Sequence, residues 1–245
     1  YDGLIEIYDV SAAGGFTRIW RNTTLPSGAV FRSVTIADVD ANGSLEVLGG
    51  VSGAHTGSAG TYVYCYSLAT GNELWHSVAL TPAIFSTVQS VEVLDLDLDG
   101  RQEIVALVRG GALTILDGPT HTPEAQIAGP FDDLRTWNRV AFQSPTLVCA
   151  RPTGDLALYR YRSGLYGNYA NVTNPGGGVS GLDIGRGDSV VVGQAGMLKL
   201  FKPLPNASWT STFTSPGIGR GSVLQVPQAR IVTTGQLGVF AVRWF

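Results

Sequence analysis

The feature that most constrains this chain is an internal repeat of short β-rich runs separated by turns, with a period of about 45 residues. The clearest copies are RSVTIADVDANGSLEVLGG at 32–50 and VEVLDLDLDGRQEIVAL at 91–107. Fainter copies are NRVAFQSPTLVCARP at 138–152, SGLDIGRGDSVVVG at 180–193 and GSVLQVPQARIVTTG at 221–235. Each copy joins two runs by a turn, and a glycine, a third run and often an aromatic-bearing fourth run follow. Runs rich in Val, Ile, Thr and aromatics, bounded by Gly and Pro, predict strands.

Four strands in each repeat are typical of a β-propeller blade, which buries its faces only against neighbouring blades. We therefore predict an all-β fold, a single β-propeller domain spanning 1–245. The four-stranded blades are expected at about 29–80, 81–128, 129–175 and 176–217, with partial blades at 1–28 and 218–245. The partial blades leave two alternatives open, a ring of about five blades with a spare strand or a segment of a longer propeller. Because the chain opens at Tyr1, we expect a mature or excised piece of a longer protein.

Two turns of the repeat concentrate acidic residues, DVDANGSLE at 38–46 and DLDLDGRQE at 95–103. Like charges this close repel one another, so a positive partner is expected. Ca²⁺ takes six to eight hard oxygen ligands from flexible loops that turn sharply at a glycine. The sequence therefore predicts two Ca²⁺ sites, with an acidic turn that binds nothing as the alternative. The predicted ligands are Asp38, Asp40, Asn42, Glu46 and the Ser44 carbonyl in one loop, and Asp95, Asp97, Asp99, Glu103 and the Arg101 carbonyl in the other.

Both loops fit the pattern D-x-D-x-[DN]-G-x-x-[DE] and so resemble FG-GAP/VCBS repeat propellers, as in integrin alpha subunits. The resemblance implies that the loop between the first two strands of a blade binds Ca²⁺. In addition, SLATGNELW at 67–75 is similar to the strand signature of PQQ-type propeller repeats. The acidic pattern is intact in two repeats only, and the Phe-Gly…Gly-Ala-Pro signature of the FG-GAP family is absent.

Glycosylation signals suggest where the protein works. Four of the chain's asparagines begin an Asn-x-Ser/Thr sequon, which favours a secreted, N-glycosylated protein at the cell surface. Chance in a chain rich in Ser and Thr is the alternative. We predict glycans at the sequons on or beside the outermost strand of a blade and assign Asn42 to the metal loop instead. The predicted glycan positions are Asn22, Asn171 and Asn206.

Composition and residue order exclude several functions. The net charge is −3 without a basic block, which argues against nucleic acid. No apolar run reaches the roughly 18 residues of a membrane span. Cys65 and Cys149 lie in different repeats and are expected to be buried free thiols. The histidines fall in different elements of the repeats, a loop, a fourth strand and a turn, and suggest no catalytic order; they are His55, His76 and His121. We therefore expect no enzymatic activity.

Two further patterns receive structural interpretations. A tryptophan recurs on the fourth strand, which predicts packing between blades, with a carbohydrate platform as the alternative. These tryptophans are Trp20, Trp75 and Trp209. The tripeptide Arg-Gly-Asp at 186–188 resembles an integrin-recognition motif, but it is interpreted as coincidence in a glycine-rich chain.

The sequence thus predicts a calcium-stabilised, extracellular, non-enzymatic module for adhesion, recognition or assembly within a larger surface protein. Its partners would be a protein or glycan ligand on the propeller loops, or neighbouring subunits. Two alternatives stay open, the propeller of a polysaccharide-acting enzyme and a purely structural filament or spacer subunit.

Overall fold

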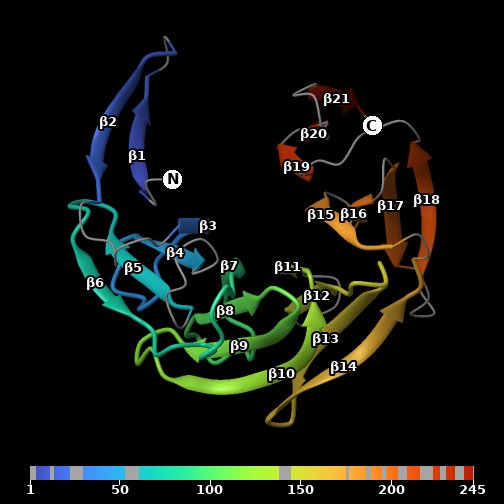
Figure 1. Ribbon diagram of the computed structural model, residues 1–245, viewed down its shortest axis with the longest axis horizontal. Helices are drawn as coiled ribbons and strands as arrows, with labels where there is room; N and C mark the ends of the chain where they lie inside the picture. The colour runs from blue at the N-terminus through green and yellow to red at the C-terminus, as the bar shows by residue number, and fades with distance from the viewer. Residues whose placement is uncertain are drawn as a thin grey trace. The chain divides into compact units, whose positions relative to one another are not determined.

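Strands form all the regular structure that is described for this chain (Figure 1). The computed structural model describes residues 4–11, 14–22, 30–52, 61–137, 145–174, 177–185, 189–194, 197–203, 209–215, 223–226, 230–234 and 240–244. The chain divides into two compact units, Tyr1–Asp95 with Asp99–Ala128, and Leu96–Leu98 with Gly129–Phe245.

The strands form antiparallel sheets in which each strand pairs with its neighbours in sequence. The first unit contains β1 (Glu6–Val10) and β2 (Phe16–Arg21); β3 (Val30–Ala37), β4 (Glu46–Ser52), β5 (Val63–Ser67) and β6 (Glu73–His76); β7 (Val88–Leu94), β8 (Glu103–Val108) and β9 (Gly111–Asp117). The fourth strand of the last sheet, β10 (Pro123–Phe131), spans the boundary between the units. The remaining strands are β11 (Asp133–Trp137), β12 (Thr146–Ala150), β13 (Leu156–Arg162) and β14 (Leu165–Val172); β15 (Val179–Gly185), β16 (Ser189–Gln194), β17 (Met197–Pro203) and β18 (Trp209–Ser215); β19 (Val223–Val226), β20 (Arg230–Thr234) and β21 (Phe240–Trp244).

Burial follows the position of a strand in its sheet. Every residue of β4, β8 and β12, the second strands of their sheets, is buried. By contrast, β6 is mostly exposed at the edge of its sheet. A strand buried on both faces requires a continuous apolar run rather than an alternating one. This requirement explains the sequences EVLGGVS and EIVALV at 46–52 and 103–108.

The core of the first unit lies between successive sheets. Val47 on β4 belongs to a cluster with Ile5 and Trp20, whereas Leu48, the next residue, belongs to a cluster with Val88. Alternate residues of one strand therefore fill cores on opposite faces of the sheet. Gly50 keeps this packing close, because a Cβ there would lie 2.7 Å from Val88 Cγ1.

The second unit has an apolar core and a buried polar network of its own. Side chains of β12 and β13 pack with those of β15 and β16, as in the cluster that contains Val148, Leu158, Leu182 and Val192. Lys199 Nζ on β17 donates to Asn174 Oδ1 at 2.6 Å and to Gln194 Oε1 at 2.8 Å. Asn174 Nδ2 in turn donates to the Gly154 carbonyl at 2.9 Å. The ammonium thus joins three segments of the unit.

The tryptophans of the fourth strands pack between sheets where their side chains are described, and both cysteines are buried. Trp20 Nε1 on β2 donates to the Leu68 carbonyl in the turn after β5, and Trp75 on β6 stacks on His121 in the turn after β9. Packing between sheets is therefore confirmed for these two tryptophans, while the Trp209 side chain lies outside the described residues. Cys65 and Cys149 are free and buried, as predicted. Burial raises the pKa of the Cys65 thiol to about 12.

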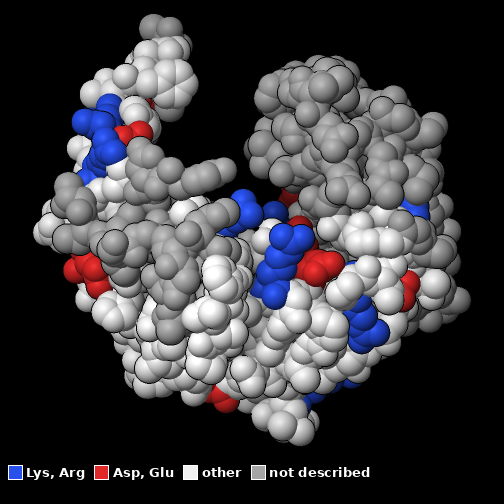
Figure 2. Space-filling model, viewed as in Figure 1, with Lys and Arg blue, Asp and Glu red and all other residues white. Residues whose placement is uncertain are grey.

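Charged side chains occur on the face shown in Figure 2 as small separate groups among larger uncharged areas. This distribution agrees with a charged fraction of 14%. Among the described residues, no helix has the length and hydropathy required to cross a membrane.

Candidate metal centres

The loops 38–46 and 95–103 connect the first two strands of their sheets and share one backbone conformation. The fourth residue of each is left-handed, with φ of 58° at Ala41 and 66° at Leu98. The sixth is left-handed as well, with φ of 86° at Gly43 and 92° at Gly100. Glycine adopts this conformation at little cost, which explains its place at the sharp turn of both loops.

The first aspartate of each loop anchors this turn. Gly43 N donates to Asp38 Oδ2 at 2.9 Å, and Gly100 N donates to Asp95 Oδ2 at 3.1 Å. Each loop therefore closes over the carboxylate at its start, which holds that side chain inside the turn.

The fifth residue of each loop caps the residue two positions later. Ser44 N donates to Asn42 Oδ1 at 2.7 Å, and Arg101 N donates to Asp99 Oδ1 at 2.8 Å. These are Asx-type bonds, in which a short side chain accepts from the backbone two residues ahead. The same bonds in two separate loops show that the pattern in the sequence specifies one local structure.

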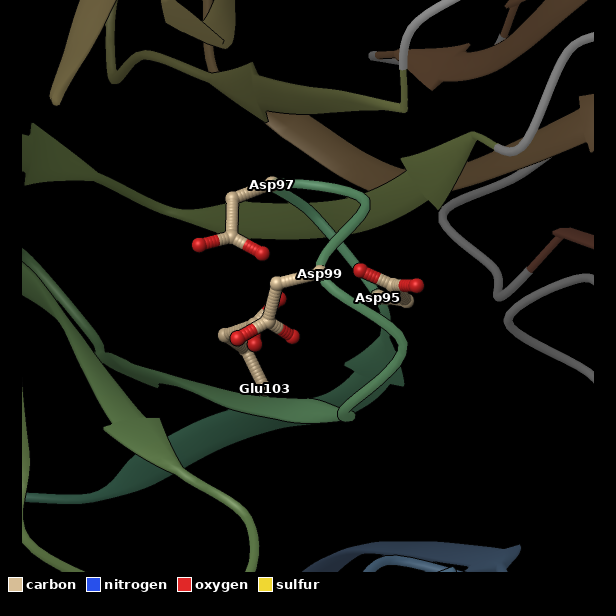
Figure 3. A group of neighbouring side chains, drawn as sticks. All are labelled: Asp95, Asp97, Asp99 and Glu103. Carbon is tan, nitrogen blue, oxygen red and sulfur yellow. The ribbon is translucent and has the colours of Figure 1, made fainter. Parts of the chain in front are cut away.

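The carboxylates converge in both loops. Ligand oxygens of Asp95, Asp97, Asp99 and Glu103 all lie within 4.8 Å of one another, and Figure 3 shows the four side chains gathered at one loop. The group Asp38, Asp40 and Glu46 meets the same limit. Two unit charges 4 Å apart interact with about 1 kcal/mol in water and about 4 kcal/mol near a protein surface. Acidic groups so arranged can bind a metal ion, which would cancel this repulsion.

The glutamate that ends each loop lies at the start of a buried strand. Glu46 is 3% exposed and Glu103 is 2% exposed. Val39 N, in the loop, donates to Glu46 Oε2 at 3.0 Å and so holds that carboxylate at the loop. Burial raises the pKa of Glu46, the hydrogen bond from Val39 N opposes that shift in part, and the negative charges of Asp40 and Asp38 raise the pKa as well. The ionised carboxylate is thus destabilised where no cation accompanies it.

One oxygen in the second loop lacks any hydrogen-bond partner. Asp95 Oδ1 is buried and accepts no hydrogen bond in the described part of the chain, although Asp95 Oδ2 is bonded to Gly100 N. A buried polar atom without a partner costs about 1–3 kcal/mol, and more where it is charged. A cation among the four carboxylates would supply that partner. The residues of this loop therefore fit a hard cation that prefers oxygen ligands.

The remaining predicted ligands are Asn42 and the carbonyls of Ser44 and Arg101. The Asn42 amide lies in its loop, where Nδ2 donates to Asp40 Oδ2 at 2.8 Å. The guanidinium of Arg101 pairs with Asp117 at 3.9 Å. The ligand roles of the Ser44 and Arg101 carbonyls stay predictions.

The glycan positions divide three ways. Asn22 is 1% exposed, its Oδ1 accepts from Ile5 N at 2.6 Å, and its Nδ2 is buried. A buried amide nitrogen disfavours a glycan in this fold, and the glycan at Asn22 stays a prediction. Asn171 is exposed on β14, and a glycan there stays a prediction. Asn206 lies outside the described residues, as does the Arg-Gly-Asp tripeptide at 186–188.

Sequence reasoning did not place the turn at 117–122 beside both loops. The signal for the turn itself is a glycine after a strand, at Gly118, where tight turns are common. Gly118 N donates to the carbonyl of Gln102, in the second loop, at 2.8 Å. His121 interacts electrostatically with Asp40, in the first loop. Burial lowers the pKa of His121, while Asp40 and Asp117 act in the opposite direction.

Successive four-stranded antiparallel sheets that bury their faces against one another define the β-propeller class. In particular, the chain is similar to BamB from Moraxella catarrhalis in its crystal structure, with a TM-score of 0.60 and 15% sequence identity. The similarity covers 100% of this chain and 67% of that chain. It confirms the predicted all-β propeller fold. No family model matches the chain. No curated protein matches it either. The resemblance to FG-GAP/VCBS repeats therefore stays a prediction.

Proposed function

We propose that this chain is a calcium-stabilised β-propeller that serves as a non-enzymatic adhesion, recognition or assembly module. The observation that carries the proposal is the pair of loops at 38–46 and 95–103, which share one conformation and gather their carboxylates. Their donor set consists of oxygen atoms, which suits Ca²⁺ or Mg²⁺ rather than a thiophilic metal. Ca²⁺ is favoured because a flexible loop tolerates its irregular geometry, whereas Mg²⁺ requires a near-ideal octahedron and keeps several waters.

The loops act on stability through the strands that they join. The first loop connects β3 to β4 and the second connects β7 to β8. Asp38 and Asp95 close the turns, while Glu46 and Glu103 lie at the start of fully buried strands. A bound divalent cation would supply positive charge at the centre of each loop. The carboxylates would then hold each pair of strands together instead of repelling one another across the turn.

The proposed location is extracellular. Its support is the sequons at Asn171 and Asn206, together with the loop chemistry, since extracellular calcium modules work at Kd values of about 10⁻⁴–10⁻³ M. Partners would be a protein or glycan ligand on the propeller loops, or neighbouring subunits. A polysaccharide-acting enzyme is the second candidate, favoured only by the convergence of several carboxylates, which is the chemistry of glycosidic-bond cleavage as well.

Elemental analysis and thermal melting together test the metal. Purified protein dialysed against Ca²⁺ should carry about two ions per chain, and Asp40→Ala and Asp97→Ala should each carry about one. A protein with no bound metal, and with a melting curve indifferent to chelator, would contradict the proposal.

The non-enzymatic role has a separate test. Incubation with a panel of acidic and neutral polysaccharides should leave chain lengths unchanged, as size-exclusion chromatography would show. Cleavage that is lost in Asp97→Ala would favour the enzymatic candidate.

The extracellular location is tested by glycopeptide mass spectrometry of native material, which should find a glycan at Asn171. Unmodified peptides at Asn171 and Asn206 would remove the support for an extracellular location.

A further inference from the structure

The turn at 117–122 between β9 and β10 touches both acidic loops. Gly118 N donates to the Gln102 carbonyl of the second loop at 2.8 Å. A Cβ built on Gly118 would lie 2.3 Å from that carbonyl oxygen and 2.4 Å from the Val39 carbonyl oxygen of the first loop. Backbone atoms of the two loops therefore meet at one glycine Cα. Val39 and Gln102 are themselves loop residues, next to the predicted ligands Asp38, Asp40 and Glu103.

Side chains strengthen both contacts of this turn. Asp117 accepts from Thr120 N at 2.7 Å, which closes the turn, and forms the ion pair of 3.9 Å with Arg101 of the second loop. On the other side, the His121 ring stacks on Trp75 of β6 with a centroid distance of 4.1 Å. The turn is thus fixed to the sheet that carries the first loop and to the loop of its own sheet. Both contacts are made by one short turn, so a movement of the turn alters both of them.

Space, not backbone strain, explains the glycine here. The left-handed glycines of the chain include Gly43 and Gly100, but Gly118 is not among them. An alanine could therefore adopt the backbone angles of Gly118, and only the two carbonyl oxygens oppose it. Contacts under 3.0 Å to backbone atoms force the backbone to move. Any such movement changes the packing of the turn against the Val39 side of one loop, the Gln102 side of the other, or both.

From this juxtaposition we propose that the turn couples the two cation sites, with Gly118 as a positioning residue for both loops. The inference rests on the proposed function, since it concerns the affinity of the same loops. Ordering one loop around a cation fixes its carbonyl against Gly118, and this orders the turn that the other loop contacts. Cation binding at one loop then raises the affinity of the other, and linkage requires the effect to be reciprocal. Direct repulsion between two bound cations would have the opposite sign, so positive cooperativity identifies the mechanical route.

Calorimetric titration of chelator-treated protein with Ca²⁺ alone tests the coupling. In Asp40→Ala only the second loop keeps its full set of ligands for Ca²⁺, and in Asp97→Ala only the first loop does. Each single-loop protein should bind its ion about five-fold or more weakly than the same loop binds in the wild type, the lower end of usual coupling energies. This comparison does not require any change at Gly118. A wild-type isotherm equal to the sum of the two single-loop isotherms would overturn the coupling while leaving the cation sites in place.

Gly118→Ala tests the positioning residue, with Gly167→Ala on β14 as the matched control. A Cβ on Gly167 would meet nothing within 4 Å, so the same chemical change is made in open space. We expect Gly118→Ala to weaken Ca²⁺ binding at both loops and abolish cooperativity, with no ligand changed, and Gly167→Ala to titrate like the wild type. If Gly118→Ala does not fold, the single-loop titrations decide the coupling. A Gly118→Ala protein that titrates like Gly167→Ala would overturn the inference, whereas a wild type that binds no Ca²⁺ would overturn the proposed function with it.

Discussion

The two acidic loops have the same backbone but compensate their charge differently. In the first loop, Asp38 Oδ1 accepts a hydrogen bond from Asn42 N at 3.0 Å. The equivalent atom of the second loop, Asp95 Oδ1, is buried without a hydrogen-bond partner in the described part of the chain. The fifth position, Asn42 in the first loop and Asp99 in the second, adds a neutral amide to one group and a carboxylate to the other. The first loop is therefore partly satisfied by its own chain, and the second depends more on an external cation.

This difference separates the roles of shape and charge. The shared φ values and hydrogen bonds show that aspartate, glycine and an Asx residue at fixed spacing are enough to fold the loop. The number of carboxylates then sets how much that fold costs without a cation and how tightly one is held. We expect the second loop to bind Ca²⁺ more tightly than the first and to lose more stability when the ion is removed.

The largest expected effect is that of a chelator on both loops. At about ten times Kd, binding contributes about 1.4 kcal/mol per site, hence about 3 kcal/mol for two sites. EGTA should therefore lower the melting temperature by several degrees on a domain of this size, and excess Ca²⁺ should restore it better than Mg²⁺. Differential scanning calorimetry measures the shift. Lys199→Met is the control, because it breaks the network in the second unit and should lower the melting temperature equally with and without chelator.

Substitution of the first aspartate in each loop should sharpen the comparison. Asp95→Asn removes a charged, unpartnered oxygen, so we expect it to weaken Ca²⁺ binding about ten-fold, about 1.4 kcal/mol, yet to stabilise the chelated protein. Asp38→Asn should weaken binding at the first loop with a smaller gain in chelated stability, because Asp38 Oδ1 already has a donor. Melting in EGTA and titration with Ca²⁺ measure the two effects. Equal gains in chelated stability would show that the unpartnered oxygen does not distinguish the loops.

Exchanging the fifth residue should convert one loop toward the other. Asn42→Asp gives the first loop four carboxylates, as in the second, while the new side chain could still accept from Ser44 N. We expect Ca²⁺ to bind several-fold more tightly at the first loop and the chelated protein to melt at a lower temperature, since repulsion increases. Asp99→Asn should do the reverse at the second loop. If titration finds that neither exchange alters affinity, the carboxylate number is not what separates the two sites.

The sequence predicted the parts of this molecule that depend on neighbouring residues. The strands follow from apolar runs bounded by glycine, and the loops at 38–46 and 95–103 follow from a pattern that folds locally. What lies across sheets could not be predicted. Burial of Asn22 depends on its bond to Ile5 N, 17 residues away, so its sequon carried no sign of it. The approach of Gly118 to Val39 joins two sheets, and no periodicity in the chain reports such a contact.

The smallest expected effect is a pH dependence that belongs to Glu46. Burial raises the pKa of this carboxyl, and Asp40 and Asp38 add to the shift. A raised carboxyl pKa means that the folded chain binds this proton more tightly than the unfolded chain does. The chelated protein should therefore gain stability from Glu46 as pH falls through its raised pKa toward the ordinary value of 4.5, and lose that gain as pH rises. The pKa values of other carboxyls shift in the opposite direction, as that of Asp117 does through its bonds to Thr120. The measured quantity is therefore the difference in melting temperature between two proteins that differ only at Glu46.

The gap in melting temperature between Glu46→Gln and the wild type, both in EGTA, should be wider at about pH 7 than at about pH 5, with Glu46→Gln the more stable near neutral pH. Saturating Ca²⁺ should reverse that order near neutral pH, because the ionised carboxylate then has a cation beside it, and a gap that is independent of both pH and Ca²⁺ would exclude Glu46 from the site.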